Sequence, residues 1–255
     1  MLAASGFAVI TYDYRGIGLS RPSRLRGFDV RVRDWADLDV EGVTNWAVST
    51  HPGLPLIAIG HSFGGHAIGL CEASRYLRGG VLICSNVAWL GFIARRFERW
   101  RVSFLFNVLG PLLVRAFGYA PSERLGLFED LPGPALLEWR SWCNLRSYFF
   151  DDPSMHASAR FAQVHAPLLI IGTYDDPWAT PPSVDLLAES FVNASRERWH
   201  ISPAEAGGRR VGHVGFFRQE HQDTLWPVLV QRLRAMLSER AAKPETPSLA
   251  RSVGI

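Results

Sequence analysis

Short runs of apolar residues recur along the 255-residue chain, and longer segments between them repeat apolar residues every three or four positions. Short apolar runs are typical of strands covered on both faces, whereas the longer spacing is typical of amphipathic helices. The predicted strands are Gly6–Asp13, Pro55–Gly60, Gly79–Ser85, Ala166–Asp176 and Arg196–Pro203. The predicted helices are Asp34–Ser49, Gly64–Leu77, Pro182–Ala194 and Asp223–Arg240. This alternation predicts an α/β fold with a mostly parallel sheet flanked by helices.

The alternation is interrupted between the third and fourth predicted strands. The residues there hold no clear strand and are rich in Trp, Phe and Leu. We interpret residues 86–160 as a helical cap inserted into a core made of residues 1–85 and 161–240. The polar, Pro-containing segment 241–255 is predicted to be a disordered, solvated tail.

The composition argues against several classes of function. The net charge is only +3, and no aromatic and basic pattern typical of an RNA-binding module occurs, so we expect no nucleic-acid partner. The three cysteines, Cys71, Cys84 and Cys143, lie in apolar segments and are odd in number. We expect buried free thiols and a reducing, cytoplasmic environment.

The longest apolar segment, Val102–Tyr119, is interrupted by Gly110, Pro111 and Arg115. It predicts a pair of helices and falls short of the ~20 apolar residues of a membrane span. The overlapping segment 94–106 mixes basic and aromatic residues, as an ordinary lid also does. We therefore expect no membrane contact; the oligomeric state is left open.

The sequence AIGHSFGG at residues 58–65 has the form G-x-S-x-G and carries the strongest chemical signal. This pattern also occurs by chance, but here an apolar strand precedes Ser62 and a helical segment follows it, as a nucleophile elbow requires. The elbow brings strand and helix close together, so its flanking positions need small residues, which Gly60, Gly64 and Gly65 supply. We expect Ser62 to be a nucleophile.

A serine nucleophile needs a base to accept its proton and an acid to hold that base. Asp175 and Asp176 directly follow the predicted strand Ala166–Asp176, and His213 lies in a Gly-flanked loop after the last predicted strand. The order Ser, acid, His is that of the α/β-hydrolase arrangement. The other histidines fit these roles less well; those at positions 61 and 66 belong to the elbow and its helix, where we expect the side chains to turn away from the Ser62 oxygen.

Four segments together resemble the α/β-hydrolase superfamily: YDYRGIGLSRP (12–22), GHSFGG (60–65), DDPW (175–178) and GHVGFF (212–217). The similarity spans almost the whole chain and is greatest to a bacterial branch related to serine aminopeptidase-like and lysophospholipase-like hydrolases. It implies Ser62 as nucleophile, His213 as base, Asp175 or Asp176 as acid, and the backbone N–H of Phe63 as an oxyanion donor. We favour Asp176 as the acid and keep Asp175 as the alternative.

The resemblance also implies what the site does. We expect a serine esterase that cleaves a small-molecule carboxylic ester or thioester with an apolar acyl or aromatic group, without cofactor or metal. In YDYRGIGLS, the Asp and Arg are expected to brace the end of a strand.

One departure from the family pattern leaves an alternative open. Relatives have a strand between those that correspond to Gly6–Asp13 and Pro55–Gly60, and its loop supplies a second oxyanion donor. We expect these elements to lie upstream of Met1, so that the chain is an N-terminally shortened hydrolase. The alternative is a catalytically impaired or silent binding protein of the same fold.

Overall fold

The computed structural model describes residues 1–126 and 129–241, and its centre is a parallel sheet of four strands in the order β1-β2-β5-β6. The strands of this sheet are β1 (Ile57–His61), β2 (Gly79–Ile83), β5 (Leu168–Thr173) and β6 (Arg196–Ile201). A short antiparallel pair, β3 (Tyr119–Ala120) and β4 (Leu131–Pro132), lies apart from it. Of the predicted tail 241–255, only Ala241 belongs to the described residues.

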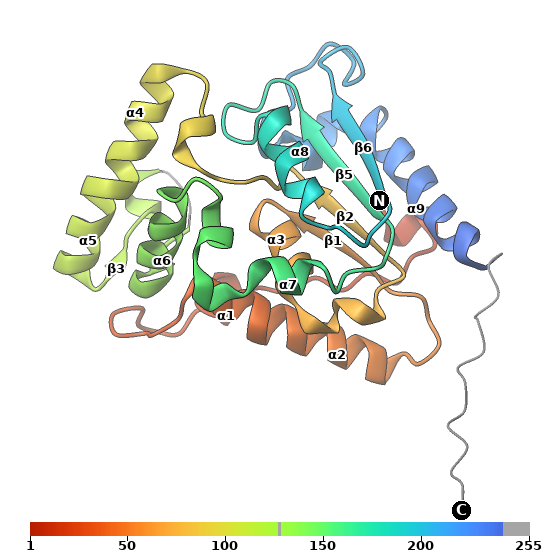
Figure 1. Cartoon of the computed structure of the whole chain (residues 1–255), viewed down its shortest axis with the longest axis horizontal. Helices are drawn as coiled ribbons and strands as arrows, with labels where there is room; N and C mark the ends of the chain where they lie inside the picture. The colour runs from red at the N-terminus through yellow and green to blue at the C-terminus, as the bar shows by residue number, and fades with distance from the viewer. Residues whose placement is uncertain (127–128, 242–255) are drawn as a thin grey trace, which may run out of the picture.

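Helices flank the sheet (Figure 1). They are α1 (Val32–Asp34), α2 (Glu41–Thr50), α3 (Phe63–Leu70), α4 (Arg96–Phe104), α5 (Gly110–Phe117), α6 (Gly133–Cys143), α7 (Ala157–Phe161), α8 (Pro181–Glu189) and α9 (Leu225–Ala241). A π-helical segment, Trp35–Val40, joins α1 to α2, so the predicted helix Asp34–Ser49 is continuous in the structure.

The two central strands explain why the sequence contains fully apolar runs. Every residue of β2 and of β5 is buried, and the strands pair in register with Ile83 opposite Ile171. Helix α3 packs against β1 and β2, while α8 packs against β5 and β6. Because parallel strands point the same way, the loops after β1, β5 and β6 meet at one edge of the sheet.

The predicted strand Gly6–Asp13 is wrong for this structure. The segment is extended, but it pairs with no strand of the described chain, and Val9, Ile10 and Tyr12 are each more than 40% exposed. A strand is defined by its hydrogen bonds to a neighbour, and this segment forms none with β1, although the edge of β1 on the side away from β2 is unpaired in the described residues.

A groove of about 390 Å³ lies between this extended segment and β1. Its lining is mostly apolar and includes Phe7, Val9, Ile57 and Ile59 on the two facing segments. The sheet thus ends at β1 with an open backbone edge, at the point where the sequence led us to expect a further strand.

The predicted helix Gly64–Leu77 ends earlier than expected. Helix α3 stops at Leu70, Cys71 is extended, and a 3₁₀ segment, Glu72–Tyr76, follows. The carboxylate of Glu41 accepts hydrogen bonds from the Ala73 backbone N–H and the Cys71 thiol. These contacts compensate for the helical hydrogen bonds lost at the break.

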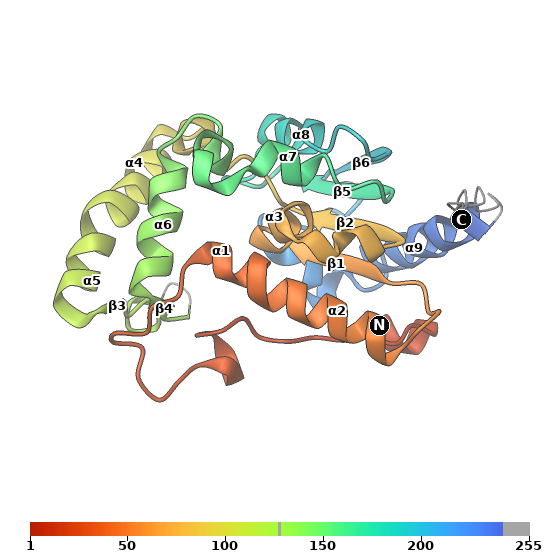
Figure 2. The same ribbon diagram turned by 60° about the horizontal axis from the view of Figure 1, so that its bottom comes forward.

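Most of residues 86–160 form helices to one side of the sheet, with α4, α5 and α6 farthest from it (Figure 1; Figure 2). The interruption predicted at Gly110 and Pro111 does not separate two helices, because Arg96–Phe117 is continuous. A π-helical turn, Leu105–Leu109, directly precedes Pro111, which lies in the first turn of α5. Proline lacks the N–H that would bond to the carbonyl four residues earlier, and the π-helical turn before it accommodates this loss within a continuous helix.

The Asp and Arg of residues 12–22 were expected to brace the end of a strand; no strand ends there in the described residues, but Asp13 and Arg15 form hydrogen bonds that fix the segment. Arg15 binds Asp39 through both its backbone N–H and its guanidinium, at 2.9 and 2.8 Å. Asp13 accepts a hydrogen bond from the Leu19 backbone N–H. The Tyr14 ring stacks on Trp35 at 5.2 Å and packs edge-on against Phe63, so this segment supports the turn beside Ser62.

Candidate active site

Ser62 lies in a tight turn between β1 and α3, with φ 50° and ψ −114°. A non-glycine residue rarely adopts a positive φ, and such strain is often found at functional sites. A side chain on Gly60 would collide with the backbone of Gly64, and one on Gly65 would collide with Ser85. The close approach of strand and helix therefore requires glycine at positions 60 and 65, whereas a side chain on Gly64 would meet only the Tyr14 hydroxyl, at 3.7 Å.

A chain of hydrogen bonds joins Ser62 to His213 and Asp176. The Ser62 hydroxyl Oγ lies 3.2 Å from His213 Nε2, and His213 Nδ1 lies 2.7 Å from Asp176 Oδ2. The three residues come from loops that follow three different strands of the sheet. The structure thus brings together three side chains that the sequence analysis singled out.

The Asp176 carboxylate is buried and held from both sides. Its Oδ2 contacts His213, while Oδ1 accepts hydrogen bonds from the backbone N–H groups of Trp178 and Ala179 at 2.8 and 2.9 Å. Burial alone would raise the pKa of Asp176, but these hydrogen bonds and the adjacent imidazole hold it below its usual value. A carboxylate at this position orients the imidazole and stabilises its protonated form.

Asp175 has a different set of partners. Its two carboxylate oxygens accept hydrogen bonds from the backbone N–H groups of Val211 and Gly212, at 2.9 and 2.8 Å. It thereby fixes the loop that carries His213 without contacting the imidazole. Of the two acids left open by the sequence, only Asp176 meets His213.

Phe63 is the first residue of α3, so its backbone N–H has no acceptor within the helix. The N-terminus of a helix also carries partial positive charge, which suits a developing oxyanion. The Phe63 ring packs edge-on against Trp35 and His66, at 5.7 and 5.8 Å. This packing fixes the backbone of the turn.

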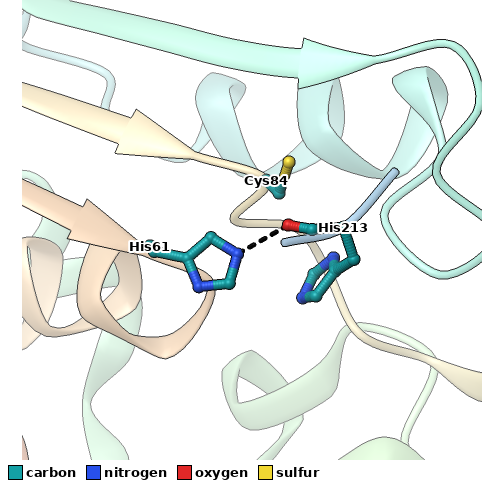
Figure 3. Close-up of side chains that lie close together, drawn as sticks. All are labelled: His61, Cys84 and His213. Atoms are coloured by element: carbon teal, nitrogen blue, oxygen red, sulfur yellow. Dashed lines mark hydrogen bonds between the residues drawn. The ribbon is translucent and has the colours of Figure 1, made fainter. Parts of the chain in front are cut away.

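His61 contacts His213, which the sequence did not predict. Its side chain was expected to turn away from the Ser62 oxygen, but its ring lies beside the ring of His213, with 5.0 Å between centroids. As Figure 3 shows, His61 Nε2 is hydrogen-bonded to the backbone carbonyl of His213, at 2.7 Å. Burial and the nearby His213 lower the pKa of His61, which favours a neutral ring that donates this hydrogen bond.

Among residues 1–126 and 129–241, one group of side chains is close enough together to hold a metal ion: His61, Cys84 and His213. Their candidate ligand atoms all lie within 4.8 Å of one another. Both ring nitrogens of His213 already face Ser62 and Asp176. Burial, followed by the charge of Asp176, raises the pKa of the Cys84 thiol and disfavours the thiolate. The arrangement suits hydrogen bonding better than metal ligation.

Trp178 is a second residue that the sequence analysis did not assign. Its ring packs edge-on against His213 at 5.2 Å, and its indole N–H donates to Glu98 of α4 at 2.8 Å. The DDPW segment contained the signal, because Trp178 follows Asp176 by two residues in the same turn. Trp178 therefore links α4 to the loop that carries Asp176.

The remaining histidines play no part in the hydrogen-bonded chain. His66 is buried, with Nε2 2.8 Å from the Asn86 carbonyl. His200 of β6 has Nε2 3.0 Å from Asp185 of α8. The three cysteines are free and buried, as expected from the sequence.

Comparison with known families identifies the framework of this site. The family model described as the alpha/beta hydrolase family matches residues 1–223. The chain belongs to the alpha/beta hydrolase family. The α/β fold class and the assignment as a hydrolase enzyme, both predicted from the sequence, are confirmed.

Solved structures of this family share the fold at low sequence identity. A monoacylglycerol lipase from Paleococcus ferrophilus is 16% identical, with a TM-score of 0.54 over 92% of this chain and 86% of the lipase. An esterase from Pyrococcus furiosus is 17% identical, with a TM-score of 0.54 over 93% of this chain and 72% of the esterase. The search of curated proteins found no match.

Proposed function

We propose that this alpha/beta hydrolase is a serine esterase that cleaves a carboxylic ester or thioester through an acyl-enzyme on Ser62. The observation that carries the proposal is the hydrogen-bonded chain from Ser62 through His213 to Asp176. A catalytically silent binding protein would not require this chain or the strained backbone of Ser62. We also propose that, within the family, this chain belongs to the branch related to serine aminopeptidase-like and lysophospholipase-like hydrolases, which its sequence resembles.

The proposed reaction begins with transfer of the Ser62 proton to His213 Nε2 as Oγ attacks the carbonyl carbon. The Phe63 backbone N–H stabilises the oxyanion of the tetrahedral intermediate, and Asp176 stabilises the imidazolium. The intermediate collapses when His213 returns the proton to the departing alcohol or thiol. A water molecule, activated by the same imidazole, then hydrolyses the acyl-enzyme.

The test of this role is turnover of a p-nitrophenyl ester by the unmodified chain and by Ser62→Ala. Loss of the nucleophile should reduce kcat by a factor of about 10⁴ or more. Ser190→Ala is a suitable control, because Ser190 is a hydroxyl residue at the end of α8, remote from His213. Near-full activity in Ser62→Ala would contradict the proposed mechanism.

We propose further that the substrate carries an apolar acyl or aromatic group, held between the site and the cap. The cap begins beside the site, where Asn86 donates to the Trp178 carbonyl, and Trp89 and Phe92 follow as half-buried rings. Each buried methylene contributes at most ~0.8 kcal/mol. With p-nitrophenyl esters of increasing length, kcat/KM should rise to a plateau, whereas strict preference for acetyl would contradict this proposal.

A further inference from the structure

The helix Arg96–Phe117 lies at the outer edge of the molecule in both views, with α6 between it and the sheet (Figure 1; Figure 2). One of its faces is fixed to α6. The Phe106 ring packs edge-on against Trp139 at 4.9 Å, and Asn107 accepts a hydrogen bond from Arg140 at 3.1 Å. These contacts attach the helix to the fold, but they involve only a few of the apolar residues of the helix.

A second set of large apolar residues on the same helix faces solvent. These residues, which we call the outer stripe, recur every three or four positions: Phe97 (74% exposed), Trp100 (63%), Phe104 (43%), Val108 (44%) and Leu112 (58%). The ring of Trp100 stacks on Phe104 at 5.8 Å and lies 6.2 Å from Phe97. Single exposed apolar residues are ordinary, but a continuous stripe of this length marks an interaction surface.

The charges beside the outer stripe are positive. Residues 95–117 contain five Arg and one acidic residue, Glu98, which gives an excess of four positive charges. Glu98 is engaged by Arg101 and by the Trp178 indole. In the part of the chain that the structure describes, the exposed side chains of Arg95, Arg96, Arg99 and Arg115 form no ion pair. These guanidinium groups are available to an anionic partner.

We propose that the outer stripe binds the surface of an anionic lipid bilayer. Aromatic and aliphatic side chains on one face, combined with arginines, are the composition of helices that lie in the bilayer interface. Anionic headgroups attract each nearby Arg. A second copy of this chain fits less well, because a symmetric contact would bring the same arginines against each other.

The helix lies on the bilayer and does not cross it. By length and composition alone, it is the one candidate for a membrane span within residues 1–126 and 129–241. Its contacts with Trp139 and Arg140 keep it in the cap, and crossing would break them. Docking would also place lipid next to the proposed site, because Glu98 of this helix holds Trp178 against His213. This proposal revises the expectation of no membrane contact, since the sequence of residues 94–106 did not reveal which side chains are exposed.

Vesicle co-sedimentation of the full chain tests the proposal, and it requires no turnover. We expect binding to vesicles of equimolar phosphatidylcholine and phosphatidylglycerol at low salt, and much weaker binding to pure phosphatidylcholine. The triple variant Phe97→Ser, Trp100→Ser, Phe104→Ser should lower partitioning at least about tenfold, because it removes the inserted side chains. The triple variant Arg95→Gln, Arg96→Gln, Arg99→Gln should lower partitioning about 100-fold, because each lost positive charge lowers it about fivefold.

The matched control replaces three other apolar residues, each more than 40% exposed and outside the cap, in the variant Trp46→Ser, Leu186→Ser, Val192→Ser. Circular dichroism verifies that all variants are folded. Binding retained by the control and lost by both cap variants supports the proposal. Absence of binding to anionic vesicles, or equal binding by the stripe variant, overturns it. A dimer in solution that only the stripe variant dissociates, without vesicle binding, would identify the surface as a protein interface and also overturn it.

Discussion

Asp175 and Asp176 are adjacent in the sequence, yet they hold different parts of the loop that carries His213. Asp176 contacts the imidazole itself at 2.7 Å, whereas Asp175 binds the backbone N–H groups of Val211 and Gly212. The first contact orients the imidazole ring of His213. The second fixes only the path of the chain.

This difference predicts unequal effects of two isosteric substitutions. Asp176→Asn should reduce kcat for an activated ester by a factor of about 10³ to 10⁴, because the amide favours the wrong tautomer of His213. Asp175→Asn should have a much smaller effect, since its oxygen still accepts one backbone hydrogen bond. Steady-state kinetics on one ester compare the two variants directly. The reverse order would show that Asp175 is the functional acid.

His61 is predicted to position His213. Its Nε2 hydrogen bond to the His213 carbonyl holds the backbone that carries the imidazole. His61→Ala should reduce kcat about 10- to 100-fold with little change in KM, because small displacements of a catalytic group are costly. His61→Asn, which keeps a short side-chain donor, should recover part of kcat.

A control for His61 is His200→Ala, which removes a histidine bound to Asp185 at a distance from His213. Thermal melting of each variant separates positioning from stability. If His61→Ala and His61→Asn lose the same activity, or if kcat falls only in proportion to the folded fraction, His61 has no positioning role.

His66 predicts a pH dependence of stability. Burial lowers the pKa of His66 from 6.5 to about 4, and its ring is enclosed by Phe63, Tyr148 and Phe149. The unfolded chain therefore binds a proton at His66 between pH 6.5 and 4, whereas the folded chain does not. The stability that the unprotonated His66 provides is therefore complete above pH 6.5, and it is lost as the pH falls towards 4. The loss should amount to about 3 kcal/mol.

Denaturant unfolding at a series of pH values measures this effect. The variant His66→Gln does not titrate, and its side-chain N–H can still donate to the Asn86 carbonyl, so its free energy of unfolding should fall less between pH 6.5 and 4. His61, whose pKa is also lowered, contributes in the same direction and is retained in both proteins. Identical slopes for the two proteins would exclude His66 as the cause.

The open edge of β1 predicts uneven hydrogen exchange. Ser62 N–H donates to Ile83 of β2, so the alternation along a strand directs the N–H groups of Ile57 and Ile59 towards the groove. These two amides should exchange much faster than those of Leu82 in β2, which lies between two strands. Equal protection of Ile59 and Leu82, measured by NMR, would contradict the open edge. The further strand expected from the sequence stays a prediction.

The parts of the fold predicted correctly are those in which a local pattern reflects burial. The fully apolar runs that became β2 and β5 are buried on both faces, and Gly60 and Gly65 are required by direct collisions. Gly6–Asp13 has the same apolar pattern but lacks a neighbouring strand. The apolar pattern of one segment does not reveal whether a neighbouring strand is present to pair with it.

The sequence predicted which residues the structure would bring together, but it did not predict the contacts that depend on side-chain direction. Motif order predicted Ser62, His213 and an acid, whereas the choice between Asp175 and Asp176 required the path of the backbone after β5. The position of His61 was missed because the residue beside Ser62 in the strand points towards a loop more than 150 residues later in the chain. The exposure of Trp100 depends on which face of its helix packs against α6, and residue spacing alone does not reveal that face.

Covalent labelling is the most direct test of the activated nucleophile that we propose at Ser62. A fluorophosphonate phosphonylates only a serine whose proton is accepted by a neighbouring base. Peptide mapping by mass spectrometry should locate a single adduct on Ser62, and labelling should be abolished in Ser62→Ala and strongly slowed in His213→Ala. Absence of labelling in the folded, unmodified chain, or an adduct on another serine, would contradict the proposed mechanism.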